Sequence, residues 1–204
     1  MKRSFDLIAR PYESLEHFYF GDALERMRHA WLPEIGPCEE ALLIGDGDGR
    51  FSHALLETNT GIRITSIDTS EKMIELARKR CRNHLDRIHF ATSNVLKSSL
   101  PADGFDFVGL HFVLDCFEQE QCDALLSRIR SATRAGGLLA YSDFSAHRHW
   151  QRFFVKCLYF SFRVTAGLTT SWLPAVDFTP WAIRRHRTEA LGGLVFSELW
   201  EKRG

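Results

Sequence analysis

Three glycines stand at alternate positions, Gly45, Gly47 and Gly49, immediately after the apolar run at residues 41–44. Glycine has no Cβ, so the chain can turn sharply there with positive φ and a ligand can lie directly against the backbone. A second apolar run ends in Asp68, whose carboxylate can accept hydrogen bonds from both hydroxyls of a ribose. A glycine-rich first loop with an acid closing the second strand is a layout that holds adenosine. These residues therefore predict an adenosine-type ligand.

The residue after the loop narrows the type of ligand. A dinucleotide-binding fingerprint needs glycine or alanine three residues after its second glycine, where helix and strand pack closely. Arg50 occupies that position, which disfavours a nicotinamide-dependent oxidoreductase. No Gly-Lys-Ser or Gly-Lys-Thr sequence follows, so a nucleotide P-loop is disfavoured as well.

The elements that must position these residues alternate along the chain. The apolar runs predict strands at about 41–45, 63–68, 87–91, 105–111 and 136–143, and the amphipathic segments predict helices at about 50–58, 70–84 and 118–132. This alternation is typical of an α/β domain with a parallel, doubly wound sheet. Ligands of such sheets bind beyond the carboxyl ends of the strands, where the winding direction switches. A last strand is expected within residues 192–200.

Four segments of this stretch carry further signals, and they fall in order. They are 42–49 with the glycine loop, 67–73 (Ile-Asp-Thr-Ser-Glu-Lys-Met), 105–108 (Phe-Asp-Phe-Val) with 113–115 (Val-Leu-Asp), and 134–139 (Arg-Ala-Gly-Gly-Leu-Leu). With these segments the chain resembles the class I S-adenosylmethionine-dependent methyltransferases over about residues 38–143. The resemblance implies a Rossmann-like, doubly wound, mostly parallel seven-stranded sheet with helices on both faces. It also implies S-adenosyl-L-methionine as the cofactor.

The resemblance assigns a cofactor contact to several residues of this chain. Gly45, Gly47 and Gly49 would face the methionine and ribose parts, Asp68 the ribose hydroxyls, Thr69 or Met73 the adenine, and Asn94 the adenine amino group. A fifth segment, residues 5–12, is similar to the Y-D-x-I-A-x-x-Y opening of many small-molecule members. Its tyrosine, Tyr12, is expected either to fold over the bound cofactor or to pack in the core.

The first motif departs from the family pattern at one position. An acid usually stands two residues before the first glycine, and this chain has Leu43 there. We expect Asp46 or Asp48 in the loop to compensate for a missing contact to the amino group of the cofactor. The departure bears on cofactor affinity more than on the fold.

His111 stands at the predicted end of the fourth strand, close to where the methyl group should lie. A histidine with a pKa near neutrality can take a proton from an incoming hydroxyl or amine. His111 is therefore the candidate catalytic residue, and a structural histidine held by hydrogen bonds is the alternative. Asp115 follows just beyond that strand, and Asp143 ends the fifth strand, where it is either a surface residue or part of the substrate pocket.

We divide the chain into an N-terminal helical cap (1–37), a cofactor-binding core (38–143) and a C-terminal part with a substrate-cover helix and the last strands (144–204). Residues 150–172 are rich in Phe, Tyr and Trp. A buried helix is the default prediction for them. A substrate cover built there would favour an apolar or aromatic acceptor, and a membrane-surface helix is a further alternative.

The composition excludes several classes of protein. Lys and Arg together number 26 and Asp and Glu 26, so there is no charge excess that indicates nucleic-acid binding. The 5 cysteines are scattered without a CxxC pair, which favours reduced thiols in the cytoplasm over disulfides or a metal site. No secretory signal and no transmembrane segment is expected.

The sequence thus predicts an S-adenosylmethionine-dependent methyltransferase that acts on a small apolar or aromatic acceptor. The alternative is a regulatory protein of the same fold that binds the cofactor without transferring a methyl group, and Leu43 is the residue in its favour. The identity of the acceptor and the oligomeric state leave no signature in the residues.

Overall fold

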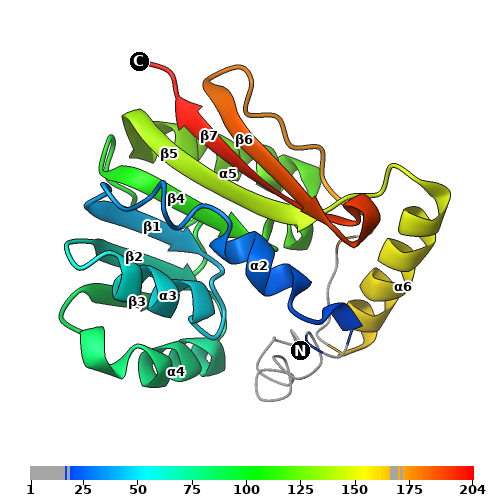
Figure 1. The fold of residues 1–204 in the computed structure, drawn as a ribbon, viewed down its shortest axis with the longest axis horizontal. Coiled ribbons are helices and arrows are strands. Elements are labelled where there is room, and N and C mark those ends of the chain that lie inside the picture. Colours follow the sequence, from blue (N-terminus) through cyan, green and yellow to red (C-terminus); the bar gives the residue numbers. More distant parts are fainter. Residues whose placement is uncertain (1–16, 18, 166–169, 171) are drawn as a thin grey trace.

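The computed structural model describes residues 17, 19–165, 170 and 172–204, which form an α/β domain (Figure 1). Its strands are β1 Glu40–Ile44, β2 Arg63–Asp68, β3 Ile88–Thr92, β4 Phe105–His111, β5 Thr133–Phe144, β6 Ala182–Ala190 and β7 Val195–Lys202. They build one 7-stranded sheet in the order β3-β2-β1-β4-β5-β7-β6. The pairs from β3 to β5 are parallel, whereas β7 runs antiparallel to both of its neighbours. The predicted mostly parallel, doubly wound sheet is confirmed.

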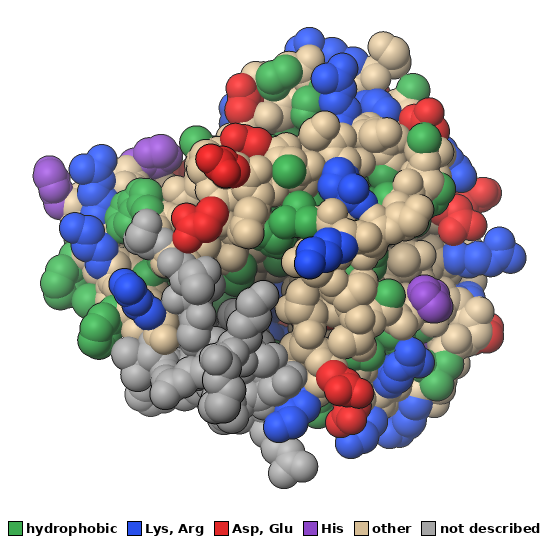
Figure 2. All heavy atoms as spheres, turned by 180° about the vertical axis from the view of Figure 1, so that it is seen from behind, with side chains coloured by type: hydrophobic (Ala, Val, Ile, Leu, Met, Phe, Trp, Pro, Cys, Tyr) green, Lys and Arg blue, Asp and Glu red, His purple; other side chains and the backbone are tan. Residues whose placement is uncertain are grey.

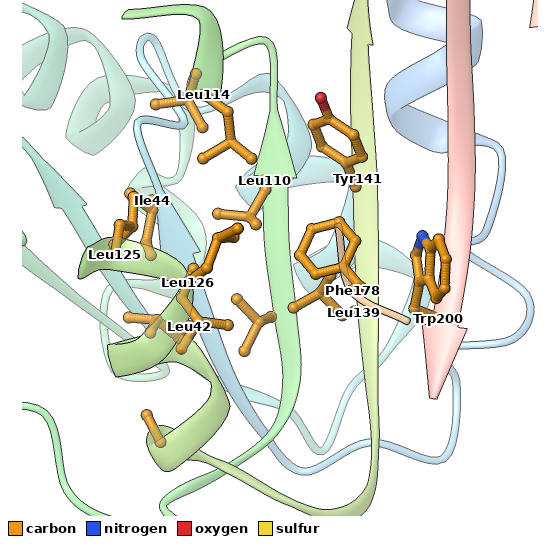
Figure 3. Close-up of a cluster of buried hydrophobic side chains, with 14 of the residues drawn as sticks. Leu42, Ile44, Leu110, Leu114, Leu125, Leu126, Leu139, Tyr141, Phe178 and Trp200 are labelled. Atoms are coloured by element: carbon orange, nitrogen blue, oxygen red, sulfur yellow. The ribbon is translucent and has the colours of Figure 1, made fainter. Parts of the chain in front are cut away.

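Helices cover both faces of the sheet (Figure 1). They are α2 Ala23–His29, α3 Arg50–Thr58, α4 Glu71–Arg80, α5 Gln119–Ala132 and α6 His149–Thr165. The strand residues alternate between two cores because successive side chains of a strand point to opposite faces. Leu42 and Ile44 pack against α5 in one apolar cluster, whereas Leu43 packs against α3 in the other. Figure 3 shows the first cluster, in which Leu125 and Leu126 of α5 face the strands.

Local signals in the sequence explain where two of the helices begin. The hydroxyl of Ser70 accepts a hydrogen bond from the backbone N–H of Met73 and so caps α4. At α5, Glu118 and Gln121 form a capping box, each side chain accepting from the other residue's backbone N–H. The predicted helix at 70–84 is shorter than expected, because α4 ends at Arg80 and only a 3-10 turn follows it.

The strand β6 was not predicted from the sequence. It is the edge of the sheet, and its residues from Ile183 to Arg187 are all exposed, so it lacks the apolar alternation that marks a half-buried strand. The predicted last strand is present as β7, but Gly192 and Gly193 belong to the turn before it. Edge strands rich in charged residues resist pairing with other chains, which accounts for the arginines.

The helix α6 stands beyond the carboxyl end of β5 and is only partly buried (Figure 1). Val155 and Tyr159 on one side pack against Phe144 and Val195 of the sheet. Phe153 on another side is 71% exposed. The default prediction of a buried helix is therefore wrong for this side of α6. None of the helices in the described ranges is long and apolar enough to cross a membrane.

Candidate functional site

The glycine loop lies at the point where the winding of the sheet changes direction. It follows β1, which pairs with β2 on one side and with β4 on the other. The chain moves outward from β1 to β3 on one side and later resumes at β4 on the opposite side. Crevices at such switch points are where open α/β sheets bind their ligands.

All three glycines of the loop have left-handed backbone, with φ of 66° at Gly45, 62° at Gly47 and 79° at Gly49. Two of them are needed for packing. A Cβ on Gly45 would collide with Val113, and one on Gly49 would lie 2.7 Å from Cβ of Ala77 in α4. Larger residues therefore cannot stand at either position without displacing Val113 or Ala77.

Gly47 differs from the other two because the space beside it is open. A Cβ there would meet only the Sδ atom of Met73, 3.9 Å away. A ligand can therefore lie directly against the backbone of Gly47. Met73 itself is buried below the loop, 3% exposed.

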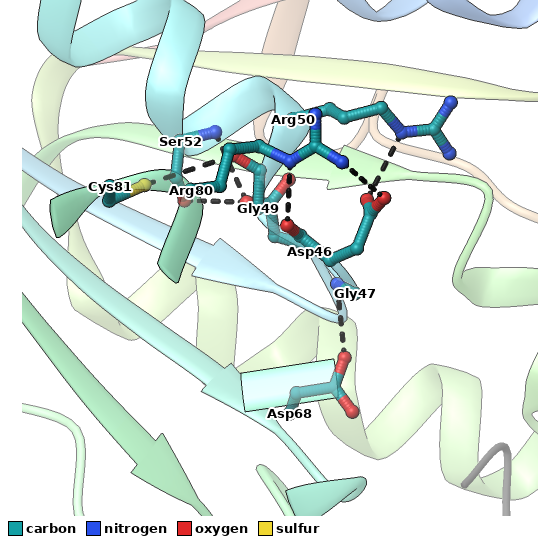
Figure 4. A network of polar contacts seen from close by, with 9 residues as sticks. Asp46, Gly47, Gly49, Arg50, Ser52, Asp68, Arg80 and Cys81 are labelled. Atoms are coloured by element: carbon teal, nitrogen blue, oxygen red, sulfur yellow. Dashed lines mark hydrogen bonds and ion pairs between the residues drawn. The ribbon is translucent and has the colours of Figure 1, made fainter. Parts of the chain in front are cut away.

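The carboxylate of Asp68 connects the second strand to this loop. Its Oδ2 atom accepts a hydrogen bond from the backbone N–H of Gly47 over 3.1 Å (Figure 4). Its Oδ1 atom accepts one from the backbone N–H of Ser70 over 2.8 Å. Each carboxylate oxygen has a second lone pair. Asp68 is half-buried at the end of β2. It is thus oriented by the loop at the carboxyl end of β2.

The two acids within the loop have structural partners (Figure 4). Oδ2 of Asp46 accepts from the backbone N–H of Ser52 over 3.1 Å and from its hydroxyl over 2.5 Å, which satisfies donors at the start of α3. Burial raises the pKa of Asp46 to about 6. Asp48 forms ion pairs with Arg50 and Arg80 at 3.1 and 3.0 Å. Both carboxylates thus have partners within the fold, and their compensation for the acid missing at Leu43 stays a prediction.

The residues expected near the adenine lie around Asp68. Thr69 is exposed directly after it. The turn that holds Asn94 is attached to β2, since the N–H of Ser93 donates to the carbonyl of Asp68 over 2.9 Å. Asn94 is exposed, and its Oδ1 atom already accepts from the backbone N–H of Leu96. Tyr12 lies outside the described residues.

His111 does not lie in the open part of the site. It is 7% exposed, its Nδ1 atom is 2.9 Å from the hydroxyl of Ser142, and its ring centre is 4.4 Å from that of Phe51. Burial, with the nearby charge of Arg28, lowers the pKa of His111 to about 3. These contacts favour the structural alternative for His111, although its Nε2 atom has no hydrogen-bond partner within the described residues.

Two buried carboxyl groups occupy the carboxyl ends of β4 and β5. Asp115 is 5% exposed and Asp143 is 1% exposed. The hydroxyl of Tyr141 donates to Oδ2 of Asp143 over 3.1 Å, and the thiol of Cys116 donates to Oδ1 of Asp115 over 3.6 Å. Within the described ranges, neither carboxyl forms an ion pair with Lys, Arg or His.

The environment of these carboxyls changes their proton affinity. Burial raises the pKa of Asp115 to about 6. Burial, and then the charge of Asp115, raise the pKa of Asp143 well above its ordinary value. Besides burial, the negative charges of Asp115, Asp143 and Asp68 raise the pKa of the Cys116 thiol. Asp115 and Asp143 are thus near enough for the charge of one to raise the pKa of the other.

A cavity of about 470 Å³ opens beside Asp143. Its aromatic wall comes from β5, β7 and the segment before β6, and consists of Tyr141, Phe144, Trp172, Phe178, Phe196 and Trp200. Arg184 and Arg187 line the same cavity, and both pair with the buried carboxylate of Glu198. No pattern in the sequence predicted this cavity, because its walls come from segments that lie far apart along the chain.

Comparisons with known proteins point to the methyltransferases. A family profile described as a methyltransferase domain matches residues 41–137. Among solved structures, the N-methyltransferase NodS from Bradyrhizobium japonicum in complex with S-adenosyl-L-homocysteine aligns with a TM-score of 0.67. The two chains are 18% identical, and the alignment covers 95% of this chain and 98% of that one. Residues 41–137 thus match a methyltransferase domain, and the chain has the fold of a solved methyltransferase.

Two curated relatives match this chain over only part of their length. The carboxy-S-adenosyl-L-methionine synthase of Sodalis glossinidius is 32% identical over 85 residues, which are 40% of this chain and 33% of that protein. The demethylmenaquinone methyltransferase of Tropheryma whipplei is 24% identical over 152 residues, 74% of this chain and 61% of that protein. The chain thus spans between a third and two thirds of the length of these relatives.

The residues present fit the cofactor of this methyltransferase family. The open space beside Gly47 leaves room for a ligand against the backbone, and Asp68 lies within hydrogen-bond distance of the same residue. A ribose has two neighbouring hydroxyls, and a carboxylate in this orientation can accept a hydrogen bond from each of them. The fit rests on the loop and on Asp68.

Proposed function

We propose that this protein transfers a methyl group from S-adenosyl-L-methionine to a small acceptor with an apolar or aromatic body. The observation that carries the proposal is the hydrogen bond between Asp68 and Gly47 beside the open space at Gly47. Gly45 and Gly49 keep the loop in the shape that places these two residues together.

The chain would hold the cofactor through its backbone and one acid. Asp68 would bind the ribose hydroxyls, the open side of Gly47 would lie against the cofactor, and Thr69 and Asn94 would border the adenine. When bound, S-adenosyl-L-methionine supplies a methyl group that its sulfonium has already activated. The protein then has to align the acceptor with this carbon and keep water out.

The acceptor would enter the cavity beside Asp143. A volume of about 470 Å³ suits a small molecule, and the rings of Tyr141, Phe178 and Trp200 offer apolar walls to an aromatic body. Arg184 and Arg187 both pair with Glu198, and Arg187 also pairs with Glu189, so two carboxylates balance the two guanidinium charges. These features favour a neutral or cationic aromatic compound over an acidic one.

We assign the removal of a proton from the acceptor to the pair Asp115 and Asp143 and not to His111. A carboxylate whose pKa is raised towards neutrality is a stronger base than an ordinary one. Asp143 lines the cavity, whereas His111 is buried under Phe51 with its pKa lowered to about 3. A base is required only where the acceptor atom must lose a proton.

Calorimetry and a product assay test this function. Titration with S-adenosyl-L-methionine and with S-adenosyl-L-homocysteine should give saturable binding, and S-adenosyl-L-homocysteine should form when aromatic amines or phenols are added. Binding without turnover across the panel would favour the regulatory protein of the same fold. The absence of binding at millimolar cofactor would contradict both functions.

Two predictions from the sequence remain proposals. We place the enzyme in the cytoplasm, which is supported by the free state of all 5 cysteines. We also retain the division into a cap (1–37), a cofactor-binding core (38–143) and a C-terminal substrate cover (144–204). Limited proteolysis with and without cofactor tests the division, because ligand binding should protect the boundaries of the core.

A further inference from the structure

The exposed side of α6 carries a strip of large apolar side chains. Phe153 and Phe160 are each 71% exposed, and Trp150 is 46% exposed. Their spacing of three and seven residues keeps them on one side of a helix. Cys157, also exposed, lies between them on the same side. Contiguous exposed apolar surface of this kind marks an interaction site.

A row of positive charge borders the strip. Arg152, Lys156 and Arg163 are exposed and follow one another at helical spacing along one edge of the aromatic side. Residues 149–165 contain no Asp or Glu. In the described part of the chain none of these three cations forms an ion pair; the Nε of Arg152 donates to the carbonyl of Ala146. Figure 2 shows apolar and basic side chains side by side at its left edge, where α6 lies.

The opposite side of α6 is held by the rest of the domain. Val155 is fully buried, and Tyr159 donates its hydroxyl to the carbonyl of Asp115 over 3.1 Å. Near the start of the helix, Gln151 donates to the carbonyl of Gly192 over 3.2 Å. The aromatic strip is therefore presented outward by a fixed helix.

We infer that this face of α6 binds the surface of a membrane that contains anionic lipids. Aromatic rings with a basic border on an amphipathic helix suit insertion into the headgroup region, where the rings leave water and the cations meet lipid phosphates. A second copy of the chain is a poorer occupant. A symmetric contact would bring the basic borders of two identical helices together, with no acid on either.

The location of α6 connects this surface with the cavity. Ala146 and His147 precede the helix and line the cavity, and Trp172 and Leu173 line it a few residues beyond the end of α6. Docking on a membrane would hold the cavity close to the interface, where apolar compounds gather. This connection rests on the proposed function, whereas binding to lipid does not.

Flotation with lipid vesicles tests the inference without any measurement of activity. The full chain is mixed with phosphatidylcholine vesicles that contain 0 or about a third phosphatidylglycerol, the composition being chosen to vary surface charge. We expect the chain to float with the anionic vesicles and much less with the neutral ones, and to be released by added salt. No flotation with anionic vesicles would overturn the inference.

Variants distinguish vesicle binding through the aromatic strip from nonspecific adsorption of the protein. The double variants Phe153→Ser with Phe160→Ser, and Lys156→Glu with Arg163→Glu, should each bind anionic vesicles at least about tenfold more weakly. Leu85→Ser is the matched control, because Leu85 is 47% exposed outside α6, and it should bind normally. Equal loss in this control would overturn the inference. Circular dichroism confirms that each variant is folded.

The aromatic variant also distinguishes binding to lipid from association with a second copy of the chain. Sedimentation velocity without vesicles should show the same species for the parent chain and for Phe153→Ser with Phe160→Ser. A dimer that this variant dissociates, together with equal flotation of both proteins, would assign the strip to self-association and contradict the inference.

Discussion

The Oδ2 atom of Asp68 lies 3.1 Å from the backbone nitrogen of Gly47 and accepts its hydrogen bond. This contact joins the end of β2 to the loop after β1, so the acid and the glycine act as one unit. Since the space beside Gly47 is open, the same unit can meet the ribose of the cofactor. The first two predictions separate the contribution of the carboxylate from that of the open space.

Replacing the carboxylate should weaken binding of the cofactor. Asp68→Ala removes charge-assisted hydrogen bonds worth roughly 1.5–3 kcal/mol, which corresponds to a loss of about 10- to 150-fold in affinity. Titration calorimetry with S-adenosyl-L-homocysteine measures the change. Asp86→Ala, an exposed acid on the surface, is the control and should bind as the parent does. Unchanged affinity of Asp68→Ala would remove this residue from the site.

Filling the space beside Gly47 should block binding. In Gly47→Val the side chain occupies the surface on which the cofactor would lie, so we expect no measurable saturation in calorimetry. The positive φ of 62° also strains a valine. Gly136→Val controls for strain, because Gly136 has φ of 73° and a Cβ added to it would meet no atom within 4 Å. Normal affinity of Gly47→Val would refute the assignment of the loop.

Substitutions at Asp143 and at His111 should differ in their effect on turnover. Asp143→Asn should lower kcat by about 10²-fold or more if the pair removes a proton, while cofactor affinity stays within about twofold of the parent. His111→Ala should retain turnover, because its imidazole is buried and bonded to Ser142. Steady-state kinetics on a responsive acceptor compares the two variants. Turnover lost in His111→Ala alone, with binding kept, would restore His111 as the base.

The pH profile of turnover provides a second check on the pair. Burial raises the pKa of Asp115 to about 6, and a base has to be deprotonated before it can act. Turnover should therefore fall as the pH is lowered through about 6. A histidine with its pKa lowered to about 3 would give no such fall near pH 6. Initial rates between pH 5 and 8 distinguish these cases.

The stability of the protein without cofactor should depend on pH through Asp46. Its folded-state pKa is raised from 3.8 to about 6, so between these values the folded state binds more protons than the unfolded state. The free energy of unfolding should then fall as the pH rises from about 4 to about 6, by up to about 3 kcal/mol from this group. Urea denaturation at several pH values measures the slope.

The variant Asp46→Asn isolates this effect. The amide oxygen can still accept the hydrogen bonds of Ser52, but it does not ionise. The variant should lose less stability than the parent as the pH rises. Asp86→Asn, at an exposed position, serves as the control. Parallel pH dependence of Asp46→Asn and the parent would contradict a raised pKa at Asp46.

Much of the cofactor site could be predicted from the sequence, because its residues are close to strand ends that local patterns reveal. An apolar run followed by Gly45, Gly47 and Gly49 places the loop, and a second run ending in Asp68 places the acid at the neighbouring strand. Parallel strands that pair in register bring their carboxyl ends to the same edge. The meeting of these residues thus follows from the order of elements along the chain.

Only the tertiary structure decided which acids and rings surround the cavity that we propose for the acceptor. Asp46 bonds to the start of α3, and Asp143 shares its surroundings with Asp115. The cavity combines side chains of β5 with those of β7, which runs antiparallel beside it. Such contacts join residues far apart in the sequence, and burial, which sets their pKa values, is a property of the packed fold. Residue type and spacing therefore determined the loop and its acid, whereas packing determined which carboxyls could take up a proton.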